Sequence, residues 1–350
     1  MPIEELTTVV GDYEVLHQAG SGGMGIVYQA RQRSLQRVVA LKVIREEIAS
    51  TPEYRDRFLR EARLAAAVDH PHVVSVFDVG EADGKLFLAM QWVDGEDLKR
   101  LLEASGRLSP ARSVAIVSQL ADALDSVHSV AGLVHRDVKP ANVLLRQVGE
   151  KDYAYLTDFG VAKPSEAADH LTKTGWMVGT SGFLSPEQIM GGEPGPRSDM
   201  YALGCLFFEA LTAHPPFRRE NEMALRWAHA NDARPKASDA VPALGARYDA
   251  FLAVALAVDP DQRFASGREF AQALQSAHEG RFEAIATPPG APAHSQTVIG
   301  PPTPIQPPAI PVVTQDITAT RCNSSSRVSQ SESYAQPTLG VVAGVWVKGR

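Results

Sequence analysis

The stretch that decides the fold is His135-Arg136-Asp137-Val138-Lys139-Pro140-Ala141-Asn142, which is followed further on by Asp158-Phe159-Gly160. A phosphoryl group in transfer carries much negative charge, so its enzyme must supply a cation, metal ligands and a group that aligns the attacking hydroxyl. Asp137 can accept a hydrogen bond from such a hydroxyl, and Lys139 stands two residues away. Asn142 and Asp158 offer the oxygen ligands that Mg²⁺ prefers. The stretch therefore predicts phosphoryl transfer chemistry.

The spacing between the two motifs makes this prediction specific. His-Arg-Asp and Asp-Phe-Gly each occur by chance in many proteins. Here Asp158 stands sixteen positions after Asn142, and short apolar runs lie between them at 143–145 and 155–156. Such runs favour strands. Independent motifs that agree in order and spacing are hard to obtain by chance.

A glycine-rich segment lies upstream, between two candidate strands. It consists of Gly20, Ser21, Gly22, Gly23, Met24 and Gly25. Alone it is weak evidence, because dinucleotide-binding folds use the same glycine spacing. In those folds the glycines lead from a strand into a helix, whereas residues 25–30 are β-branched and aromatic and favour a second strand. The segment is therefore predicted to be a hairpin whose backbone N–H groups can approach phosphates closely, since glycine has no Cβ.

A single lysine interrupts an apolar strand after this hairpin. Lys42 stands among valine, leucine and isoleucine, where a charge requires a partner or incurs a desolvation cost. Glu61 follows nineteen residues later, in a helix predicted over 53–67. Alone, Glu61 is better explained by an i,i+4 surface pair with Arg57. Beside Lys42 and Asp158, we interpret Glu61 as the partner of the lysine.

Together these motifs resemble the glycine-rich loop, lysine strand, catalytic loop and magnesium loop of the eukaryotic-like protein kinases. The resemblance covers about residues 12–278 and includes the later landmarks Ser185-Pro186-Glu187, Asp199 and Arg263. The Gly-Gly-Met-Gly tip, His70-Pro71 and the His-Arg-Asp-Val-Lys-Pro run look most like the bacterial Ser/Thr kinases, especially the actinobacterial ones. The departures are Ser185 for alanine, Val138 for leucine and Gln91-Trp92 in the hinge, and none of them removes a functional atom.

The resemblance implies a role for each catalytic residue. Asp137 would orient and deprotonate the acceptor hydroxyl, and Lys139 would neutralise charge on the γ-phosphate. Lys42 would bind the α- and β-phosphates of ATP while being held by Glu61. Lys139 is also typical of Ser/Thr-directed rather than tyrosine-directed relatives.

The same resemblance implies an ATP site and a metal site. Mg²⁺, or Mn²⁺ as an alternative, would be bound by Asn142 and Asp158. Met90 takes the position of the gatekeeper side chain. The residues implied in ATP binding are Gly20, Ser21, Gly22, Gly23, Met24, Gly25, Val27, Ala40, Lys42, Met90, Gln91, Val93 and Leu144.

An activation segment is implied between residues 160 and 185. Arg136 is expected to be a buried cation that a phosphate on this segment would neutralise. Thr172 and Thr174 are the expected autophosphorylation sites, with solvated loop threonines as the alternative. Thr180 is expected to help position the substrate, with a helix N-cap as the alternative. The expected structural supports are Arg136, Phe159, Asp199 and an ion pair between Glu187 and Arg263.

The course of the chain predicts an α+β fold of two lobes, a bilobal protein-kinase-like arrangement with ATP between the lobes. An N-terminal extension covers 1–11, and the kinase domain covers 12–278. Within the domain we expect a small β-rich lobe over about 12–90, a hinge over 91–95 and a larger helical lobe over 96–278. In the helical lobe, Ser109-Pro110 predicts a helix start, and further helices are expected over 198–212, 244–257 and 266–277.

The 350-residue chain has the composition of a soluble protein. Its 34 basic and 41 acidic residues leave a net charge of −7, which argues against a dedicated nucleic-acid binder. Two cysteines in dissimilar settings provide neither a disulfide framework nor a zinc spacing, as suits a reducing cytosol. The N-terminus lacks the features of a signal peptide. The expected location is cytoplasmic.

Residues 279–350 form a tail that is predicted to be disordered. Nine prolines fall within 287–311, and 324–333 is rich in serine. The closing run 339–347 is apolar for nine residues, about half of the roughly 20 needed to span a bilayer. Membrane attachment is therefore not predicted, and both a soluble member and a shortened membrane receptor stay open. The threonines expected to recruit phosphothreonine-binding partners are Thr287, Thr297 and Thr303.

Two other functions compete with phosphorylation of protein Ser/Thr hydroxyls. A nucleotide-binding scaffold without transfer usually lacks the lysine or one of the two aspartates, and Lys42, Asp137 and Asp158 are all present. Small-molecule kinases tend to lack the long activation segment and the Ser-Pro-Glu element. Protein substrates are thus the expected partners, and the resemblance adds a homodimer through the smaller lobe.

Overall fold

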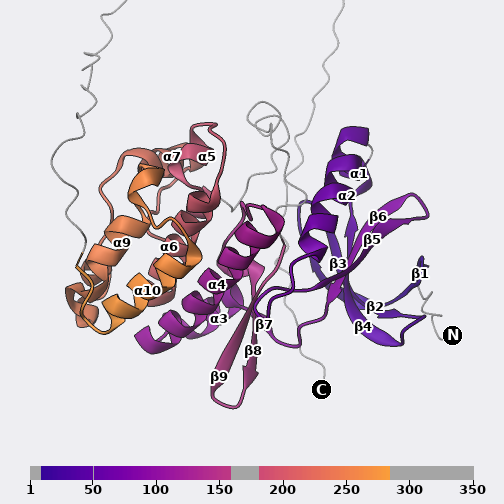
Figure 1. The fold of residues 1–350 in the computed structure, drawn as a ribbon, viewed down its shortest axis with the longest axis horizontal. Helices are drawn as coiled ribbons and strands as arrows, with labels where there is room; N and C mark the ends of the chain where they lie inside the picture. The colour runs from indigo at the N-terminus through magenta and orange to yellow at the C-terminus, as the bar shows by residue number, and fades with distance from the viewer. Residues whose placement is uncertain (1–8, 50, 159–180, 284–350) are drawn as a thin grey trace, which may run out of the picture. The chain divides into compact units, whose positions relative to one another are not determined.

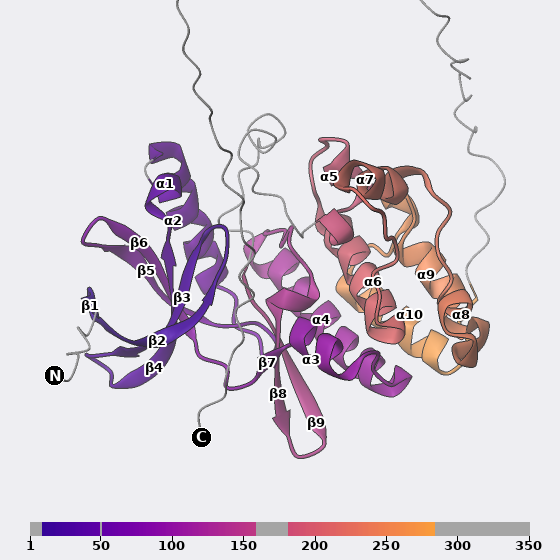
Figure 2. The same cartoon turned by 180° about the vertical axis from the view of Figure 1, so that it is seen from behind.

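The computed structural model describes residues 9–49, 51–158 and 181–283 of the chain. In these residues a β-rich lobe comes first and a helical lobe second, as Figures 1 and 2 show from opposite sides. The predicted α+β class with two lobes is confirmed. The chain divides into two compact units, 1–287 and 288–350, and the second lies outside the described residues.

A six-stranded antiparallel sheet forms the first lobe, in the order β1-β2-β3-β4-β6-β5. Lys42 lies within it, opposite Val27 on one side and Leu88 on the other. Its strand therefore has neighbours on both edges, which fixes the position of the lysine backbone. The strands are β1 Val9–Val10, β2 Tyr13–Ser21, β3 Gly25–Gln32, β4 Arg37–Ile44, β5 Val76–Ala82 and β6 Lys85–Gln91.

Helix α2 (Pro52–Ala66) packs against this lobe and matches the helix predicted over 53–67. Proline at its first position suits a helix start, where no N–H donor is needed. Its buried residues Tyr54, Phe58, Ala62 and Ala65 recur at helical spacing and form one face. A short helix, α1 (Glu46–Ala49), precedes it.

A second, smaller sheet lies on the C-terminal side of the hinge. It contains β7 (Glu96–Asp97), β8 (Val143–Val148) and β9 (Lys151–Leu156), in that order. The β8–β9 hairpin is tied to helix α4 (Pro110–Ala131) by a two-point ion pair, because Arg112 Nε and Nη2 lie 2.6 and 2.9 Å from the carboxylate oxygens of Asp152. The hairpin thus carries the residues on either side of it, Asn142 and Asp158, on a fixed support.

Helix α6 (Pro196–Thr212) forms the centre of the helical lobe. It is buried along nearly its whole length, as expected for a helix that is apolar on all sides. Helices α4 and α10 pack against each other beside it. The remaining helices are α3 Leu98–Ser105, α5 Pro186–Ile189, α7 Glu222–Asn231, α8 Ala237–Ala240, α9 Asp249–Ala255 and α10 Gly267–His278. Short 3₁₀ turns are η1 Pro140–Asn142, η2 Ser181–Phe183, η3 Pro242–Tyr248 and η4 Pro260–Gln262.

Most of the predicted helices match in position, and one differs. Ser109 caps α4, where its side chain accepts the N–H of Arg112 at 3.3 Å. The helix predicted over 244–257 is instead a 3₁₀ turn, η3, that passes into α9 only at Asp249. The cause is Gly245, whose φ of +59° is incompatible with a right-handed helix.

Among the helices of the described ranges, none has the length and the apolar character needed to cross a membrane.

Candidate active site

The catalytic-loop residues predicted from the sequence lie together in space. Lys139 Nζ is 2.9 Å from Asp137 Oδ2. Asn142 Nδ2 donates to the backbone oxygen and to Oδ2 of Asp137, both at 2.9 Å. The side chains of Asp137 and Lys139 are only 12 and 21% exposed. Their charges are therefore partly withdrawn from water. Charges interact more strongly in such surroundings than in bulk water.

Asp199 of α6, an expected structural support, holds the backbone of this loop. Its Oδ2 accepts the N–H of His135 at 2.7 Å, and its Oδ1 accepts the N–H of Arg136 at 2.8 Å. Arg136 has a φ of +63°, a conformation that costs an L-residue about 1–3 kcal/mol. Hydrogen bonds from two adjacent N–H groups to one buried carboxylate offset that strain.

His135 connects the catalytic loop to the segment that carries Asp158. It is fully buried, and burial lowers its pKa, so the ring is neutral near pH 7. Nδ1 accepts the N–H of Asp137 at 3.3 Å, which leaves Nε2 as the donor to Thr157 O at 3.1 Å. A second link runs from Thr157 N–H to Asn142 O at 3.0 Å. The two loops are therefore held in fixed relation to each other.

Lys42 differs from expectation in its partner. Its Nζ lies 2.6 Å from Asp158 Oδ1, whereas no ion pair joins Lys42 to Glu61 in the parts of the chain that the structure describes. One carboxylate at this distance suffices for a lysine that is 13% exposed. Asp158 itself has a φ of +57°, so a strained backbone conformation presents it to the lysine.

Glu61 lies instead in a field of arginine charges. Burial raises the pKa of its carboxyl, and the positive charges of Arg136, Arg57 and Arg60 oppose that rise. The catalytic-loop arginine thus acts on the carboxylate that the sequence assigned to Lys42. The Nε of Arg136 is buried and makes no hydrogen bond with the described residues.

The glycine-rich segment is a hairpin tip between two strands, which rules out the strand-to-helix arrangement of the dinucleotide fold. β2 ends at Ser21, and β3 begins at Gly25. A Cβ on Gly25 would lie 2.3 Å from Val43 O, so β3 can approach β4 this closely only with glycine there. Gly22 N–H donates to Gly25 O at 2.9 Å and closes the tip.

Several of the residues implied in ATP binding also come together. Met90 and Val93 are buried in one apolar cluster, against which Ala40, Leu144 and Met24 pack. Gln91 of the hinge is fixed by its N–H, which donates to Ser75 O at 2.9 Å. A pocket extends behind Met90 toward α2, and its walls include Phe58, Thr157 and the Lys42–Asp158 pair.

Asn142 and Asp158 have donor atoms that suit a divalent cation. The amide nitrogen of Asn142 is bound to Asp137, so its oxygen must face the other way. Asp158 uses Oδ1 for Lys42 and retains a second carboxylate oxygen. Hard oxygen ligands of this kind fit Mg²⁺ or Mn²⁺.

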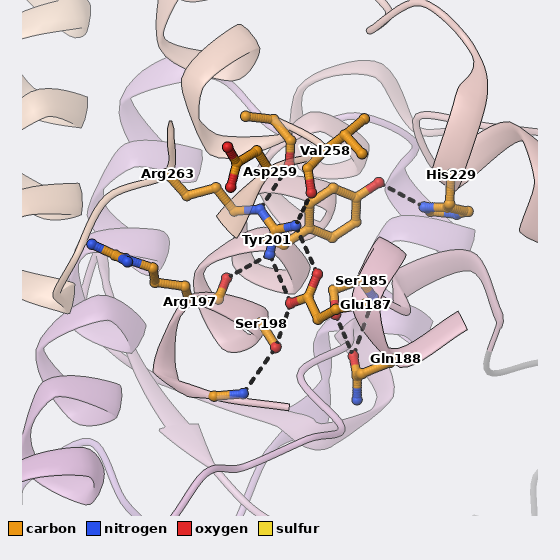
Figure 3. Close-up of polar contacts among 12 residues, drawn as sticks. Ser185, Glu187, Gln188, Arg197, Ser198, Tyr201, His229, Val258, Asp259 and Arg263 are labelled. Atoms are coloured by element: carbon orange, nitrogen blue, oxygen red, sulfur yellow. Dashed lines mark hydrogen bonds and ion pairs between the residues drawn. The ribbon is translucent and has the colours of Figure 1, made fainter. Parts of the chain in front are cut away.

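Glu187 and Arg263 form the expected ion pair, shown in Figure 3. Arg263 Nη1 and Nη2 lie 2.9 and 2.8 Å from the two oxygens of Glu187, and the arginine side chain is 0% exposed. Burial opposes ionisation of Glu187, but hydrogen bonds from Arg263 and Ser198 outweigh it and lower the pKa to about 2. Arg263 also stacks on Tyr201, 4.8 Å from the ring centre. The pair fixes α5 to the helical lobe.

Four predicted site residues lie outside the described residues: Phe159, Thr172, Thr174 and Thr180. Sequence reasoning also missed two residues that the structure brings into the site. His128 Nε2 lies 2.8 Å from Asp199 Oδ2, and Ser198 Oγ donates to Glu187 at 2.5 Å. Ser198 has an available signal, since it directly precedes Asp199. His128 has none, because it stands in the last turn of a long amphipathic helix.

A two-lobed α+β fold around a lysine–aspartate pair and an aspartate–lysine–asparagine loop is the arrangement of the protein kinases. Residues 13–278 match the family model described as protein kinase domain. The chain belongs to this family.

Relatives with curated names include the serine/threonine-protein kinase PknE of Mycobacterium bovis, 40% identical over 270 residues, which are 77% of this chain and 47% of PknE. The serine/threonine-protein kinase PknH of Mycobacterium tuberculosis is 38% identical over 304 residues, 87% of this chain and 48% of PknH. The chain spans about half the length of the curated relatives it matches. The crystal structure of the M. tuberculosis PknI kinase domain is similar with a TM-score of 0.63 and 34% identity, covering 79% of this chain and all of that one.

Proposed function

We propose that this chain is a serine/threonine protein kinase that transfers the γ-phosphate of Mg-ATP to protein hydroxyls. The observation that carries the proposal is the convergence of Asp137, Lys139 and Asn142 at 2.9 Å contacts. His135 and Thr157 connect this group to Asp158 and its lysine. Membership of the protein kinase family and the names of the curated relatives support the same activity.

We propose one step in the transfer for each of these residues. Asp137 accepts the hydrogen bond of the acceptor hydroxyl and takes its proton as the oxygen attacks the γ-phosphorus and the bond to the β,γ-bridging oxygen breaks. Lys139 offsets the negative charge that develops beside Asp137. Lys42 binds the α- and β-phosphates, and Asn142 and Asp158 would hold the divalent cation. That cation, when bound, neutralises charge on the phosphate oxygens.

Serine and threonine are favoured as acceptors over tyrosine for two reasons. Lys139 is typical of Ser/Thr-directed relatives, and the curated relatives carry serine/threonine kinase names. A nucleotide-binding scaffold is disfavoured, because Lys42, Asp137 and Asp158 are all present and in contact with charged partners.

The test is transfer of label from γ-labelled ATP in the presence of Mg²⁺, with the full chain and its Asp137→Asn variant. We expect label in the wild type and at least about 100-fold less in the variant, because the proton acceptor is lost. Asp83→Asn is the matched control, since Asp83 is exposed in a turn with a φ of +51° that asparagine also adopts. Absence of label from the wild type, with nucleotide still bound, would refute transfer and indicate a scaffold.

Regulation by phosphorylation is supported by the charges around Arg136. Its Nε is buried without a hydrogen bond to the described residues, and its charge acts on Glu61. We propose that phosphate on Thr172 or Thr174 binds Arg136 and frees Glu61 to approach Lys42.

Replacing both Thr172 and Thr174 with alanine should therefore lower activity toward a protein substrate by about tenfold or more. Ser129→Ala, an exposed hydroxyl on α4, serves as the control. Activity measured with a peptide and phosphosite mapping by mass spectrometry decide the matter. Unchanged activity of the double variant would exclude these threonines as activating sites.

Partners and location follow as further proposals. Autophosphorylation at Thr287, Thr297 or Thr303 would recruit phosphothreonine-binding proteins, and mapping the tail after incubation with ATP tests this. The activity is assigned to the cytoplasm, where ATP and reduced thiols are present. A homodimer is the third proposal, and size-exclusion chromatography with light scattering would detect it.

A further inference from the structure

Arg45, the first residue after β4, is bonded to the tip of the glycine-rich hairpin, residues 22–24. Its Nε and Nη2 lie 3.3 and 3.2 Å from Gly22 O. Its backbone N–H donates to Met24 O at 3.0 Å, which continues the ladder that pairs Gly25 with Ile44. One residue thus binds two carbonyl groups of the tip, although its own side chain is exposed.

The hydrogen bond from Arg45 to Gly22 O also determines where the N–H of Gly23 points. A peptide unit is planar and trans, so its C=O and N–H face opposite sides. Binding Gly22 O to Arg45 therefore turns the N–H of Gly23 away from the arginine. Side chains alternate between the two faces of a strand. Arg45 stands three residues after Lys42, so its side chain extends on the face opposite to that of the lysine. The N–H of Gly23 is thereby directed to the lysine side.

Such a constraint matters at this place because the tip contains two glycines. Glycine populates more backbone conformations than other residues, and fixing them costs conformational entropy. A tip that is already oriented loses less entropy when phosphates bind. No other side chain within the described residues bonds to the tip backbone.

We propose that Arg45 is a positioning residue, which fixes the Gly22–Gly23 peptide with its N–H toward the phosphates of the nucleotide. The proposal rests on the proposed function, because it assumes that ATP is the ligand of the hairpin. Arg45 acts through the backbone of the hairpin and on the phosphate part of the ligand alone.

The experiment compares Arg45→Ala with Arg31→Ala in the full chain. Arg31 is an exposed arginine of β3 in the same lobe, so the control removes the same charge without touching the tip. Amide hydrogen exchange over residues 20–26 should be faster in Arg45→Ala alone. The dissociation constant of ADP by calorimetry should rise about fivefold, as for loss of one hydrogen-bonded contact, and that of adenosine should change less than about twofold. KM for ATP should rise while kcat is retained.

Three results would overturn the proposal. The first is unchanged exchange in the tip of Arg45→Ala. The second is an equal loss of affinity for adenosine and ADP, which would point to a general change of the lobe. The third is an equal loss of ADP affinity in Arg31→Ala, which would point to net charge. Exchange and binding need no turnover, so a wild type that fails to transfer phosphate would refute the proposed function and still leave these results interpretable.

Discussion

Glu209 of α6 is a carboxyl group in surroundings that disfavour its charge. Its Oε2 is buried and has no hydrogen-bond partner in the described residues. Burial raises its pKa from 4.5 to about 7, although Arg218 and Lys99 oppose the rise. The folded state therefore holds a proton here more tightly than the unfolded chain does. This proton makes the stability of the helical lobe depend on pH.

The sign of that dependence is set by linkage. With a folded pKa of about 7 and an ordinary value of 4.5, the contribution of protonated Glu209 is complete below pH 4.5 and is lost as the pH rises through 7. Glu209→Gln should remove this loss and at pH 8 raise the free energy of unfolding by up to about 3 kcal/mol relative to wild type. Thermal melts at pH 5 and pH 8 measure it, with exposed Glu150→Gln as the control. A pH dependence that is the same in Glu209→Gln and wild type would contradict the assignment.

At the same scale, the sequence predicts which residues form the site better than it predicts their partners. Asp137, Lys139 and Asn142 come together because they stand within one short loop, where spacing alone limits their separation. Lys42 could have paired with either of two carboxylates, Glu61 or Asp158. Which of them is nearer depends on how α2 packs on the sheet, and that is a property of tertiary structure.

Among the elements, α5 depends on a single buried ion pair. Glu187 and Arg263 satisfy each other, and Arg263 also donates to Ala257 O, Val258 O and Arg197 O. The low pKa of Glu187, about 2 against 4.5, means that its contribution to stability is present above pH 4.5 and is lost as the pH falls toward 2.

Arg263→Met should lower the free energy of unfolding by about 3–5 kcal/mol, because it leaves a half-buried carboxylate without its partner. Arg197→Met is the matched control: Arg197 pairs with Asp261, whose side chain is 84% exposed, and such a surface pair contributes less than about 1 kcal/mol. Urea unfolding of both variants measures the difference. Similar losses in the two would show that burial does not distinguish these pairs.

The elements themselves could be predicted in type but not always in their limits. The predicted ends of α2, α6 and α10 lie within two residues of the observed ends. For α4 only the start was predicted, and it also matches. The exception is the start of α9, where Gly245 interrupts the apolar pattern without a proline or a charge cluster to signal it. A positive φ at one glycine is a local conformational choice that periodicity does not report.

For the whole molecule, every buried core residue in the described ranges lies between Val10 and Ala277. The compact unit 1–287 therefore contains all of this core. A chain that ends after Thr287 should melt within about 2 °C of the full chain and phosphorylate a peptide at a similar rate. Calorimetry and a peptide assay check both. A large fall in melting temperature would show that residues 288–350 stabilise the domain.

The two-lobed architecture was predictable because its signals are numerous and independent, from the glycine hairpin to the long apolar helices. The pairing of Lys42 with Asp158 and the connection through His135 were not predictable, because both are contacts between segments distant in sequence. Fold class thus follows from local pattern, and the particular arrangement of the site follows from packing.

Because the carboxylate of Asp199 holds the catalytic loop, the two lobes position different parts of the site. Asp137 and Asp158 are both located by the helical lobe, through α6 and His135, whereas Lys42 and the glycine hairpin belong to the β-rich lobe. A tilt of one lobe against the other would change how often ATP phosphates arrive in register with the acceptor. It would leave the alignment of the acceptor unchanged. Under the proposed function, a change at the hinge would alter the frequency of productive encounters, while the alignment of the acceptor would stay constant.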